Sequence, residues 1–196
     1  MSPEAVAAWR QTGLGHDAGP VPQRPQERQA WMRFKSQTLT RFTLDLRQAV
    51  QAIRGPQVKT ARNLFALPIL EPQSEAWFAQ NLDDFLAAYD WTVPMAMPLM
   101  ESVPIDASQA WLTRLVQAVA SHPGALKKTI FELQARDWNR RQQNAIPDQQ
   151  LADWMRLLRL NGVKNYGYYP DDFINNQPDI SRIRPQFSSW WYPDHD

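Results

Sequence analysis

The sequence predicts an α/β fold with a parallel sheet. Segments rich in β-forming residues alternate with helical patterns, and one strand with its helix takes about 30 residues. Strands that alternate with helices in this way are joined by right-handed crossovers and pair in parallel. Four such units fit either one half of a (β/α)8 barrel or a small open sheet. An open doubly wound sheet usually has an early glycine-rich phosphate loop, which this sequence lacks, so the barrel is favoured.

The composition is that of a globular protein. Of the 196 residues, 43% are hydrophobic and 21% are charged, and the formal net charge of +1 gives no electrostatic reason to expect nucleic acid as a partner. The absence of cysteine excludes disulfides and thiolate metal sites. There is neither a signal-peptide pattern nor an apolar run of about 18 residues, which taken alone indicates a cytoplasmic protein. The nine tryptophans are either core residues or the lining of a site for a flat ligand such as a sugar.

Residues 1–55 are predicted to form a helical lead-in. Ser2 and Pro3 begin a short helix that ends at about Gln11, and residues 16–25 form a loop because of their glycine and proline content. A long amphipathic helix follows at residues 26–53. Its apolar stripe is predicted to be core and consists of Trp31, Phe34, Leu39, Phe42, Leu46 and Ile53.

Residues 56–196 are predicted to form four β/α units. The first strand leads through two prolines to a helix with Ser74 as its N-cap, and the second leads to a helix capped by Asp106. The helix of the third unit ends at Gly162. The predicted strands are residues 58–67, 91–98, 127–138 and 163–170, and the predicted helices are residues 75–89, 107–120, 147–160 and, as a shorter pattern, 179–187.

Functional side chains in parallel α/β folds lie at the carboxyl ends of the strands. Alternation along the third strand puts an apolar set on the face toward the helices, namely Phe131, Leu133 and Ala135. Glu132 then points into the barrel, where an unpaired carboxylate would be costly. It is therefore predicted either to pair with Arg136 or Arg62 or to contact a ligand. Trp138, at the end of this strand, is either a loop anchor or a platform on which a sugar stacks.

Alternation divides the fourth strand into two faces, with Asn165, Gly167 and Tyr169 on one and Tyr166 and Tyr168 on the other. A glycine within a strand often marks close approach of backbone or ligand. The Gly167 face is therefore predicted to look inward and to bring Tyr169 to the mouth of the barrel. Asp171, which follows the strand, either contacts the ligand or caps the next turn.

Paired carboxylates point to glycoside hydrolysis, which commonly uses two carboxyl groups about 5 to 9.5 Å apart. Glu101 follows the second strand and is a second carboxylate predicted at the mouth. By position alone the candidates are Glu101, Glu132, Asp137, Asp171 and Asp172. The three histidines have no metal-ligand spacing, and neither a G-x-S-x-G elbow nor a phosphate loop is present. No metal and no cofactor is predicted.

Three stretches carry a resemblance to a known family: "ARNLFALPILEPQSEAWFAQN" (residues 61–81), "MAMPLMES" (residues 95–102) and "NGVKNYGYYPDDFINNQPDISRIRPQFS" (residues 161–188). They are similar to the carboxyl-terminal domain of the periplasmic poly-β-1,6-N-acetyl-D-glucosamine deacetylases of Gram-negative biofilm systems, and the resemblance runs over essentially the whole chain. It implies the carboxyl-terminal portion of a (β/α)8 (TIM) barrel, with about four β/α units preceded by a long helix.

The resemblance also implies a function. Such a domain binds partly deacetylated poly-β-1,6-N-acetylglucosamine and acts on it as a glycoside hydrolase, in the periplasm at the outer membrane, during biofilm exopolysaccharide export. Glu101, which matches a residue lining the family's groove, is predicted to be catalytic. The predicted substrate-binding residues are Glu132, Trp138, Tyr166, Tyr168, Tyr169 and Asp171.

The sequence also departs from the family pattern. It lacks the deacetylase domain and the first half of the barrel, and the aspartate proposed as the family's proton donor lies before the stretch that matches residues 2–14. We therefore expect one incomplete barrel domain, from a truncated or split gene, that is inactive alone. Its open strand edges lead us to expect an upstream polypeptide that completes the barrel. The alternatives are a non-catalytic carbohydrate-binding module and an inactive remnant.

Overall fold

The computed structural model of the protein describes residues 25–139 and 144–187, together with Glu4, Ala7, Ala8 and Gln11. The predicted helix at residues 2–11 and the loop at residues 16–25 lie almost entirely outside these residues. Four parallel strands form one sheet in the order β1-β2-β3-β4, which confirms the predicted parallel α/β arrangement. The strands are β1 (Ala61–Leu64), β2 (Trp91–Ala96), β3 (Phe131–Gln134) and β4 (Tyr166–Tyr169).

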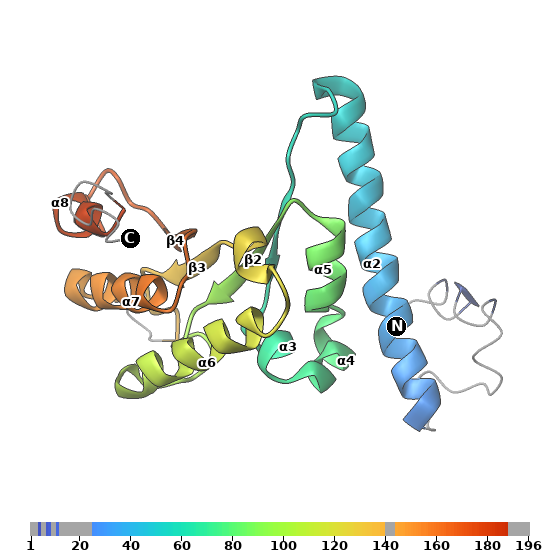
Figure 1. Ribbon diagram of the computed structural model, residues 1–196, viewed down its shortest axis with the longest axis horizontal. Helices are drawn as coiled ribbons and strands as arrows, with labels where there is room; N and C mark the ends of the chain where they lie inside the picture. The colour runs from blue at the N-terminus through green and yellow to red at the C-terminus, as the bar shows by residue number, and fades with distance from the viewer. Residues whose placement is uncertain (1–3, 5–6, 9–10, 12–24, 140–143, 188–196) are drawn as a thin grey trace.

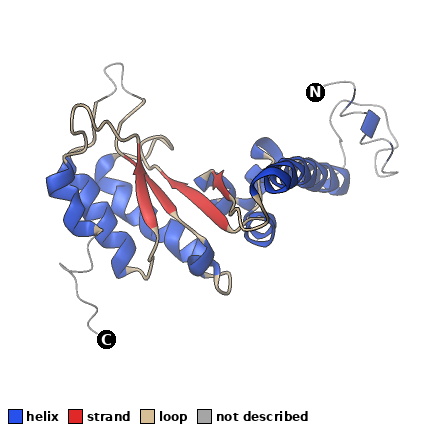
Figure 2. Ribbon diagram, turned by 90° about the horizontal axis from the view of Figure 1, so that it is seen from above, coloured by secondary structure: helices blue, strands red, loops and turns tan. Residues whose placement is uncertain are grey.

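The helices pack along one side of the strands, as Figures 1 and 2 show. They are α2 (Pro25–Arg54), α3 (Ala66–Leu70), α4 (Glu75–Phe78), α5 (Leu82–Ala88), α6 (Ser108–Ala120), α7 (Asp148–Leu160) and α8 (Ile180–Ile183). The long α2 lies against α4 and α5. Within the described part of the chain, none of the helices combines the length and the apolar character needed to cross a membrane.

The connection between β1 and β2 differs from the prediction. The first strand ends at Leu64, and the following residues form α3 instead of continuing the strand. The single helix predicted at residues 75–89 is two helices, because Ala79 adopts a left-handed conformation with φ 50° and ends α4. The side chain of Asn81 then caps α5 by accepting a hydrogen bond of 3.1 Å from the backbone N–H of Asp84.

The third predicted strand was also too long. A 3-10 turn at Ala125–Lys128 precedes β3, which begins at Phe131. Likewise, Asp106 does not cap α6, because it lies within another 3-10 turn, Ile105–Ala107, and α6 begins at Ser108. In both places a turn of 3-10 helix takes residues whose local sequence also suits the neighbouring strand or helix.

The core lies between the sheet and the helices. The alternation predicted for β3 is confirmed on this face, since Phe131, Leu133 and Ala135 are all buried. The largest fully buried side chain is Trp154 of α7, whose indole N–H donates a hydrogen bond of 2.9 Å to the hydroxyl of the buried Ser108. This contact joins α7 to the first residue of α6 inside the core.

The ladder between β2 and β3 is interrupted in its middle. Met95 and Ala96 pair with Glu132 and Leu133, and an isolated bridge joins Thr92 to Thr129 further back. The gap between them contains Pro94, which has no N–H to donate. The pairing of β1 with β2 is continuous over the same stretch.

The apolar stripe of α2 is mostly exposed, so the prediction that it is core was wrong for most of its length. Trp31 is buried. Leu39, Phe42, Leu46 and Ile53 are exposed, as is Val50 between them. The face of α2 that packs on its neighbours is more polar, and it buries Ser36 and Thr40.

Asp90 ties the start of β1 to the start of β2. Its carboxylate accepts hydrogen bonds from the backbone N–H of Thr60 at 2.9 Å and the Thr60 hydroxyl at 3.0 Å. Lys59 donates to its other oxygen at 3.2 Å, and a guanidinium nitrogen of Arg47 lies 3.7 Å away. The backbone hydrogen bond from Thr60, helped by Lys59, lowers the pKa of Asp90 to about 2.

We expect Asp90→Asn to lower the free energy of unfolding by about 1–2 kcal/mol at pH 7. The lowered pKa means that the carboxylate's stabilisation is fully present above its ordinary pKa of 3.8 and is lost as the pH falls toward about 2. The difference between the two proteins should therefore shrink over that interval in urea unfolding series. Asp45→Asn, at an exposed position of α2, is the control. Equal losses for the two variants would contradict the prediction.

Candidate functional site

A hollow of about 300 Å³ opens at the carboxyl ends of the strands, and we call it the strand-end pocket. All four strands or the loops after them contribute to it. Its lining consists of Asn63, Met95, Met97, Met100, Glu132, Trp138 and Tyr169. This is where parallel α/β folds place their functional side chains.

Strand register explains why these residues meet. Met95 of β2 is paired with Glu132 of β3, and Glu132 is paired with Gly167 of β4. Paired residues of parallel strands point to the same face of the sheet, and residues two apart share that face. Asn63 and Tyr169 therefore join the same row, on the side opposite the buried helix-facing residues.

Two aromatic rings form one wall of the strand-end pocket. The rings of Trp138 and Tyr169 have centroids 6.1 Å apart and an interplanar angle of 23°. Tyr169 is 56% exposed, so this stacked pair presents flat apolar surface to solvent beside the polar groups of the pocket. Such a surface is suited to the apolar face of a ring-shaped, polar ligand.

Glu132 supplies the carboxylate of the pocket. One of its oxygens accepts a hydrogen bond of 2.8 Å from the side-chain amide of Asn63. The predicted pairing with an arginine was wrong, and Arg62 instead donates to the hydroxyl of Tyr89 at 2.6 Å. Partial burial raises the pKa of Glu132 above its usual value, and the hydrogen bond from Asn63 opposes that rise.

We therefore expect Asn63→Ala to raise the pKa of Glu132 further, because desolvation would then act without the opposing amide. The measurement is a carbon-13 NMR titration of the Glu132 carboxyl group. Asn175→Ala is a matched control, since Asn175 donates to another carboxylate, Asp172, outside the pocket. An unchanged or lower pKa for Glu132 in the Asn63 variant would show that the hydrogen bond does not stabilise the charged form.

A buried amide fixes the loop that follows β2. The side-chain oxygen of Gln134 accepts hydrogen bonds from the backbone N–H groups of Leu99 at 2.7 Å and Met100 at 3.3 Å. Its side-chain nitrogen donates to the carbonyl of Arg136 at 2.9 Å. Asn139 also donates to the carbonyl of Leu99. These contacts hold Met100 at the edge of the strand-end pocket.

Comparison with known proteins gives the chain a family. The family model of hypothetical glycosyl hydrolase family 13 matches residues 1–169. The chain belongs to that family. The poly-beta-1,6-N-acetyl-D-glucosamine N-deacetylases of Escherichia coli K12 and O157:H7 are each 53% identical to it over 196 residues, which is 100% of this chain and 29% of theirs.

A solved family structure extends the comparison to the fold. The PgaB (BpsB) glycoside hydrolase domain from Bordetella bronchiseptica matches with a TM-score of 0.88 and 43% identity, over 95% of this chain and 52% of that one. The predicted partial (β/α)8 barrel is thereby confirmed. The chain spans about half of that solved chain and under a third of the curated relatives.

Glu101, the predicted catalytic residue of this family member, does not line the strand-end pocket. It lines a separate hollow of about 370 Å³ together with Glu71 and Arg114. Burial raises the pKa of Glu101 there. In the loop after β2, Met100 therefore lines the strand-end pocket, and its neighbour Glu101 lines the separate hollow.

Three other residues that were predicted to bind substrate, Tyr166, Tyr168 and Asp171, also do not line the strand-end pocket. Tyr166 and Tyr168 point to the helix side of β4, where their ring centroids lie 5.7 and 6.2 Å from that of Phe187. The hydroxyl of Tyr168 donates a hydrogen bond of 3.1 Å to the carboxylate of Asp171. Of the residues predicted to bind substrate, the structure thus brings together Glu132, Trp138 and Tyr169.

Several lining residues were missed by sequence reasoning. The lining residues that were not predicted are Asn63, Met95, Met97 and Met100. Alternation could have found Asn63 and Met95, which occupy inward positions of their strands, and Met97, which continues the alternation one residue beyond β2. Met100 lies beyond β2, and no local pattern predicts its direction.

Proposed function

We propose that this chain supplies a saccharide-binding surface to a glycoside hydrolase domain that acts on partly deacetylated poly-β-1,6-N-acetylglucosamine. The observation that carries this proposal is the stacked Trp138–Tyr169 pair beside the half-buried carboxylate of Glu132. Further support comes from relatives named as deacetylases of that polymer and from the solved glycoside hydrolase domain.

The pocket chemistry fits a partly deacetylated polymer. A pyranose ring has an apolar face of C–H groups that can lie on Trp138 or Tyr169, and burial of that face supplies the binding energy. The rim of the sugar carries hydroxyl groups and, where the acetyl group is missing, an ammonium group. Glu132 would accept hydrogen bonds from either, and a cation beside it would favour its charged form.

We propose that the chain alone binds this polymer without cleaving it. Glycoside hydrolysis commonly requires two carboxyl groups on opposite sides of the scissile bond. Within the described lining of the strand-end pocket, Glu132 is the single carboxyl group. The alternative function is a non-catalytic carbohydrate-binding module, for which the same surface would suffice.

The resemblance to the periplasmic deacetylases extends the proposal to cellular context. We propose that the protein works in exopolysaccharide export, in the periplasm and in association with the outer membrane. We also propose that a polypeptide completes the barrel at its open strand edges.

The test is calorimetric titration of the chain with partly deacetylated oligosaccharides, compared with fully acetylated and cellulose-derived oligosaccharides of equal length. We expect binding that is tightest for the partly deacetylated series. Reducing ends released from the same oligosaccharides are measured in parallel. Absence of binding at millimolar concentrations would refute the saccharide surface, and turnover by the chain alone would refute the non-catalytic assignment.

Gly167 offers an independent probe of the same surface. A Cβ atom built on Gly167 meets no atom within 4 Å, so the space in front of β4 is open, and no neighbouring protein atom requires a glycine there. We expect Gly167→Ala to fold at least as stably as the wild type but to bind the oligosaccharide several-fold more weakly, because the methyl group would occupy space at the sugar. Unfolding curves measure the stability of the variant, and calorimetry measures its affinity for the oligosaccharide. An unchanged affinity would mean that the sugar does not lie in front of Gly167.

A further inference from the structure

We propose that the loop after β4, residues 171–177, forms a second sugar subsite beside the strand-end pocket. The ring of Phe173 and the carboxylate of Asp171 are its binding groups. This inference rests on the proposed function, because the ligand is a further unit of the same partly deacetylated polymer. We call residues 171–177 the β4 loop and the site that they form the outer subsite.

The strand-end pocket is small for a polymer. Its volume of about 300 Å³ is at the lower end of the range for small-molecule sites, so it can hold a short part of a polysaccharide. The rest of the polymer must continue over the surface around the pocket. The β4 loop is part of that surface, because it begins two residues after Tyr169, which is in the pocket wall.

The β4 loop lies beside the loop that carries Trp138. The latter follows β3, which is the strand paired with β4. Hydrogen bonds from Asn175 lower the pKa of Asp172 in the β4 loop, and the nearby positive charge of Arg136 lowers it further. Arg136 precedes Trp138 by two residues. A sugar chain that stacks on Trp138 can therefore continue across the β4 loop.

Hydrogen bonds fix the shape of the β4 loop. The backbones of Asp172 and Gln177 exchange two hydrogen bonds of 2.9 Å and close the loop at its base. The Asp172 carboxylate accepts hydrogen bonds from the backbone N–H of Asn175 at 3.1 Å and from its side-chain amide at 2.8 Å. Just beyond the loop, the N–H of Asp179 donates to the carboxylate of Asp148 on α7 at 3.1 Å. A loop held in this way loses little conformational freedom when a ligand binds.

The tip of this fixed loop presents two large apolar side chains to solvent. Phe173 is 82% exposed and Ile174 is 81% exposed. The hydrogen bonds that shape the loop come from its backbone and its polar side chains, so the fold does not require apolar residues at the tip. Apolar side chains displayed on a fixed loop are typical of a binding surface. The ring of Phe173 offers a flat surface for the apolar C–H face of a pyranose.

Charge complementarity favours a deacetylated unit as the occupant. Asp171 is exposed and precedes Phe173 by two residues. The hydroxyl of Tyr168 donates a hydrogen bond of 3.1 Å to its carboxylate and so orients it. A sugar unit without its acetyl group carries an ammonium group, which pairs with such a carboxylate, whereas an acetylated unit has no charge there. The outer subsite therefore selects deacetylated units of the polymer.

The test is calorimetric titration of the chain with a partly deacetylated disaccharide and a partly deacetylated hexasaccharide. We expect the wild type to bind the hexasaccharide more tightly, because the longer ligand reaches the outer subsite. Phe173→Ala should weaken hexasaccharide binding about 5- to 10-fold and leave disaccharide binding unchanged. Asp171→Asn, which keeps an acceptor for the hydroxyl of Tyr168, should weaken binding of the partly deacetylated hexasaccharide about 3- to 5-fold. It should not weaken binding of a fully acetylated hexasaccharide.

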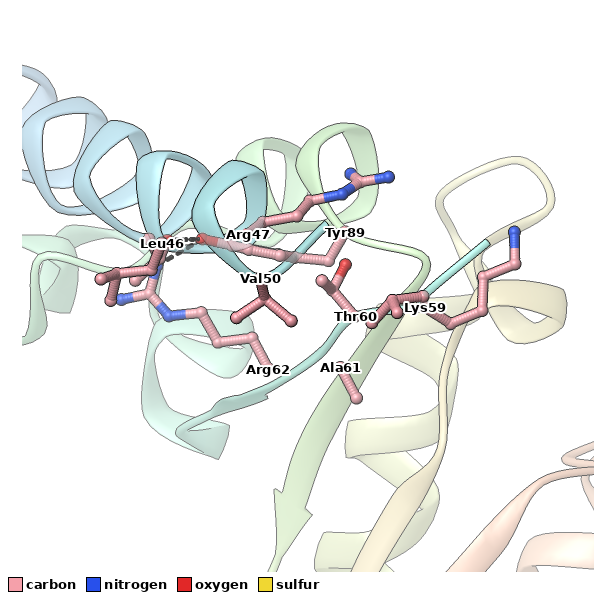
Figure 3. A pocket seen from close by; sticks show the side chains of 10 residues that line it. Leu46, Arg47, Val50, Lys59, Thr60, Ala61, Arg62 and Tyr89 are labelled. Atoms are coloured by element: carbon pink, nitrogen blue, oxygen red, sulfur yellow. Dashed lines mark hydrogen bonds between the residues drawn. The ribbon is translucent and has the colours of Figure 1, made fainter. Parts of the chain in front are cut away.

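Two exposed residues outside the outer subsite provide matched controls. Trp77 of α4 is a 76% exposed aromatic residue, and Leu46 of α2 is a 52% exposed apolar residue. In Figure 3, Leu46 lines a hollow together with Lys59 and Thr60, which lead into the amino end of β1, opposite the end where the strand-end pocket opens. Trp77→Ala and Leu46→Ala should bind both ligands like the wild type.

Circular dichroism and melting of each variant verify that the substitutions leave the fold intact. Wild-type hexasaccharide affinity in the Phe173→Ala protein would overturn the outer subsite while the proposed function stands. Equal losses for the two ligands would overturn it as well, because Phe173 would then act at the strand-end pocket. A dimer of the chain that Phe173→Ala dissociates would assign the loop tip to a second copy and overturn the proposal. Absence of binding of either ligand to the wild type would refute the proposed function and the outer subsite together.

Discussion

Replacing Trp154 with alanine is expected to lower the free energy of unfolding by about 3–5 kcal/mol. The side chain is fully buried in the core cluster between the sheet and the helices. Its removal leaves a large cavity, and the buried hydroxyl of Ser108 loses the hydrogen bond from the indole N–H while it still donates to the carbonyl of Ile105. A typical domain has about 5–15 kcal/mol of stability in total, so this variant should be close to unfolding at room temperature.

The measurement is urea unfolding followed by circular dichroism, with Trp154→Phe as the comparison. Phenylalanine keeps most of the buried volume but cannot donate to Ser108, so it should lose about 1–3 kcal/mol. Trp77→Ala, at a 76% exposed tryptophan, should change stability by about 0.5 kcal/mol or less. A Trp154→Ala protein as stable as the Trp77 variant would mean that α6 and α7 do not pack as described.

Replacing Trp138 with alanine is expected to weaken binding of partly deacetylated oligosaccharide by ~10- to 100-fold. The ring is one half of the stacked pair that forms the apolar wall of the strand-end pocket. Its loss removes about 1.5–3 kcal/mol of apolar contact and leaves Tyr169 without its neighbour. The fold should remain intact, because Trp138 lies in the loop beyond β3 and is only partly buried.

Calorimetry with the same oligosaccharide checks this prediction, and the melting temperature of the variant confirms folding. Trp77→Ala controls for loss of an exposed tryptophan elsewhere and should bind like the wild type. Tyr169→Phe keeps the ring and should retain most of the affinity, whereas Tyr169→Ala should not. Wild-type affinity in the Trp138→Ala protein would remove the aromatic pair from the binding surface.

The order and type of the four strands and of the helices α2, α6 and α7 could be predicted from the sequence, because the hydrophobic period is a local property. Element ends were less accurate where two local preferences compete. At Ala79 no glycine or proline marks the end of α4, although Ala79 is left-handed there and the side chain of Asn81 caps the next helix, α5. Exposure of the α2 stripe was beyond prediction for another reason. Periodicity shows which face of a helix is apolar, and it does not show whether anything covers that face.

The site was predictable to the extent that it depends on alternation along a strand. Alternation placed Glu132 inward and Tyr169 at the mouth, and both line the pocket. The partner of Glu132 depends on how separate strands align, and Asn63 is 69 positions away in the sequence. The direction of Glu101 depends on a loop in which Ser102 has a φ of 60°, and no residue pattern specifies that turn.

The interruption at Pro94 lies in the middle of the pairing between β2 and β3. Because Pro94 donates no hydrogen bond to β3, the sheet can bend more sharply between β2 and β3, and a closed barrel requires such bending. Asn63 lies in β1 and Glu132 in β3, so the hydrogen bond between their side chains spans this bend. The contact between Asn63 and Glu132, together with the contacts of Gln134 to the loop after β2, therefore fixes the bent sheet at the end where the strand-end pocket opens.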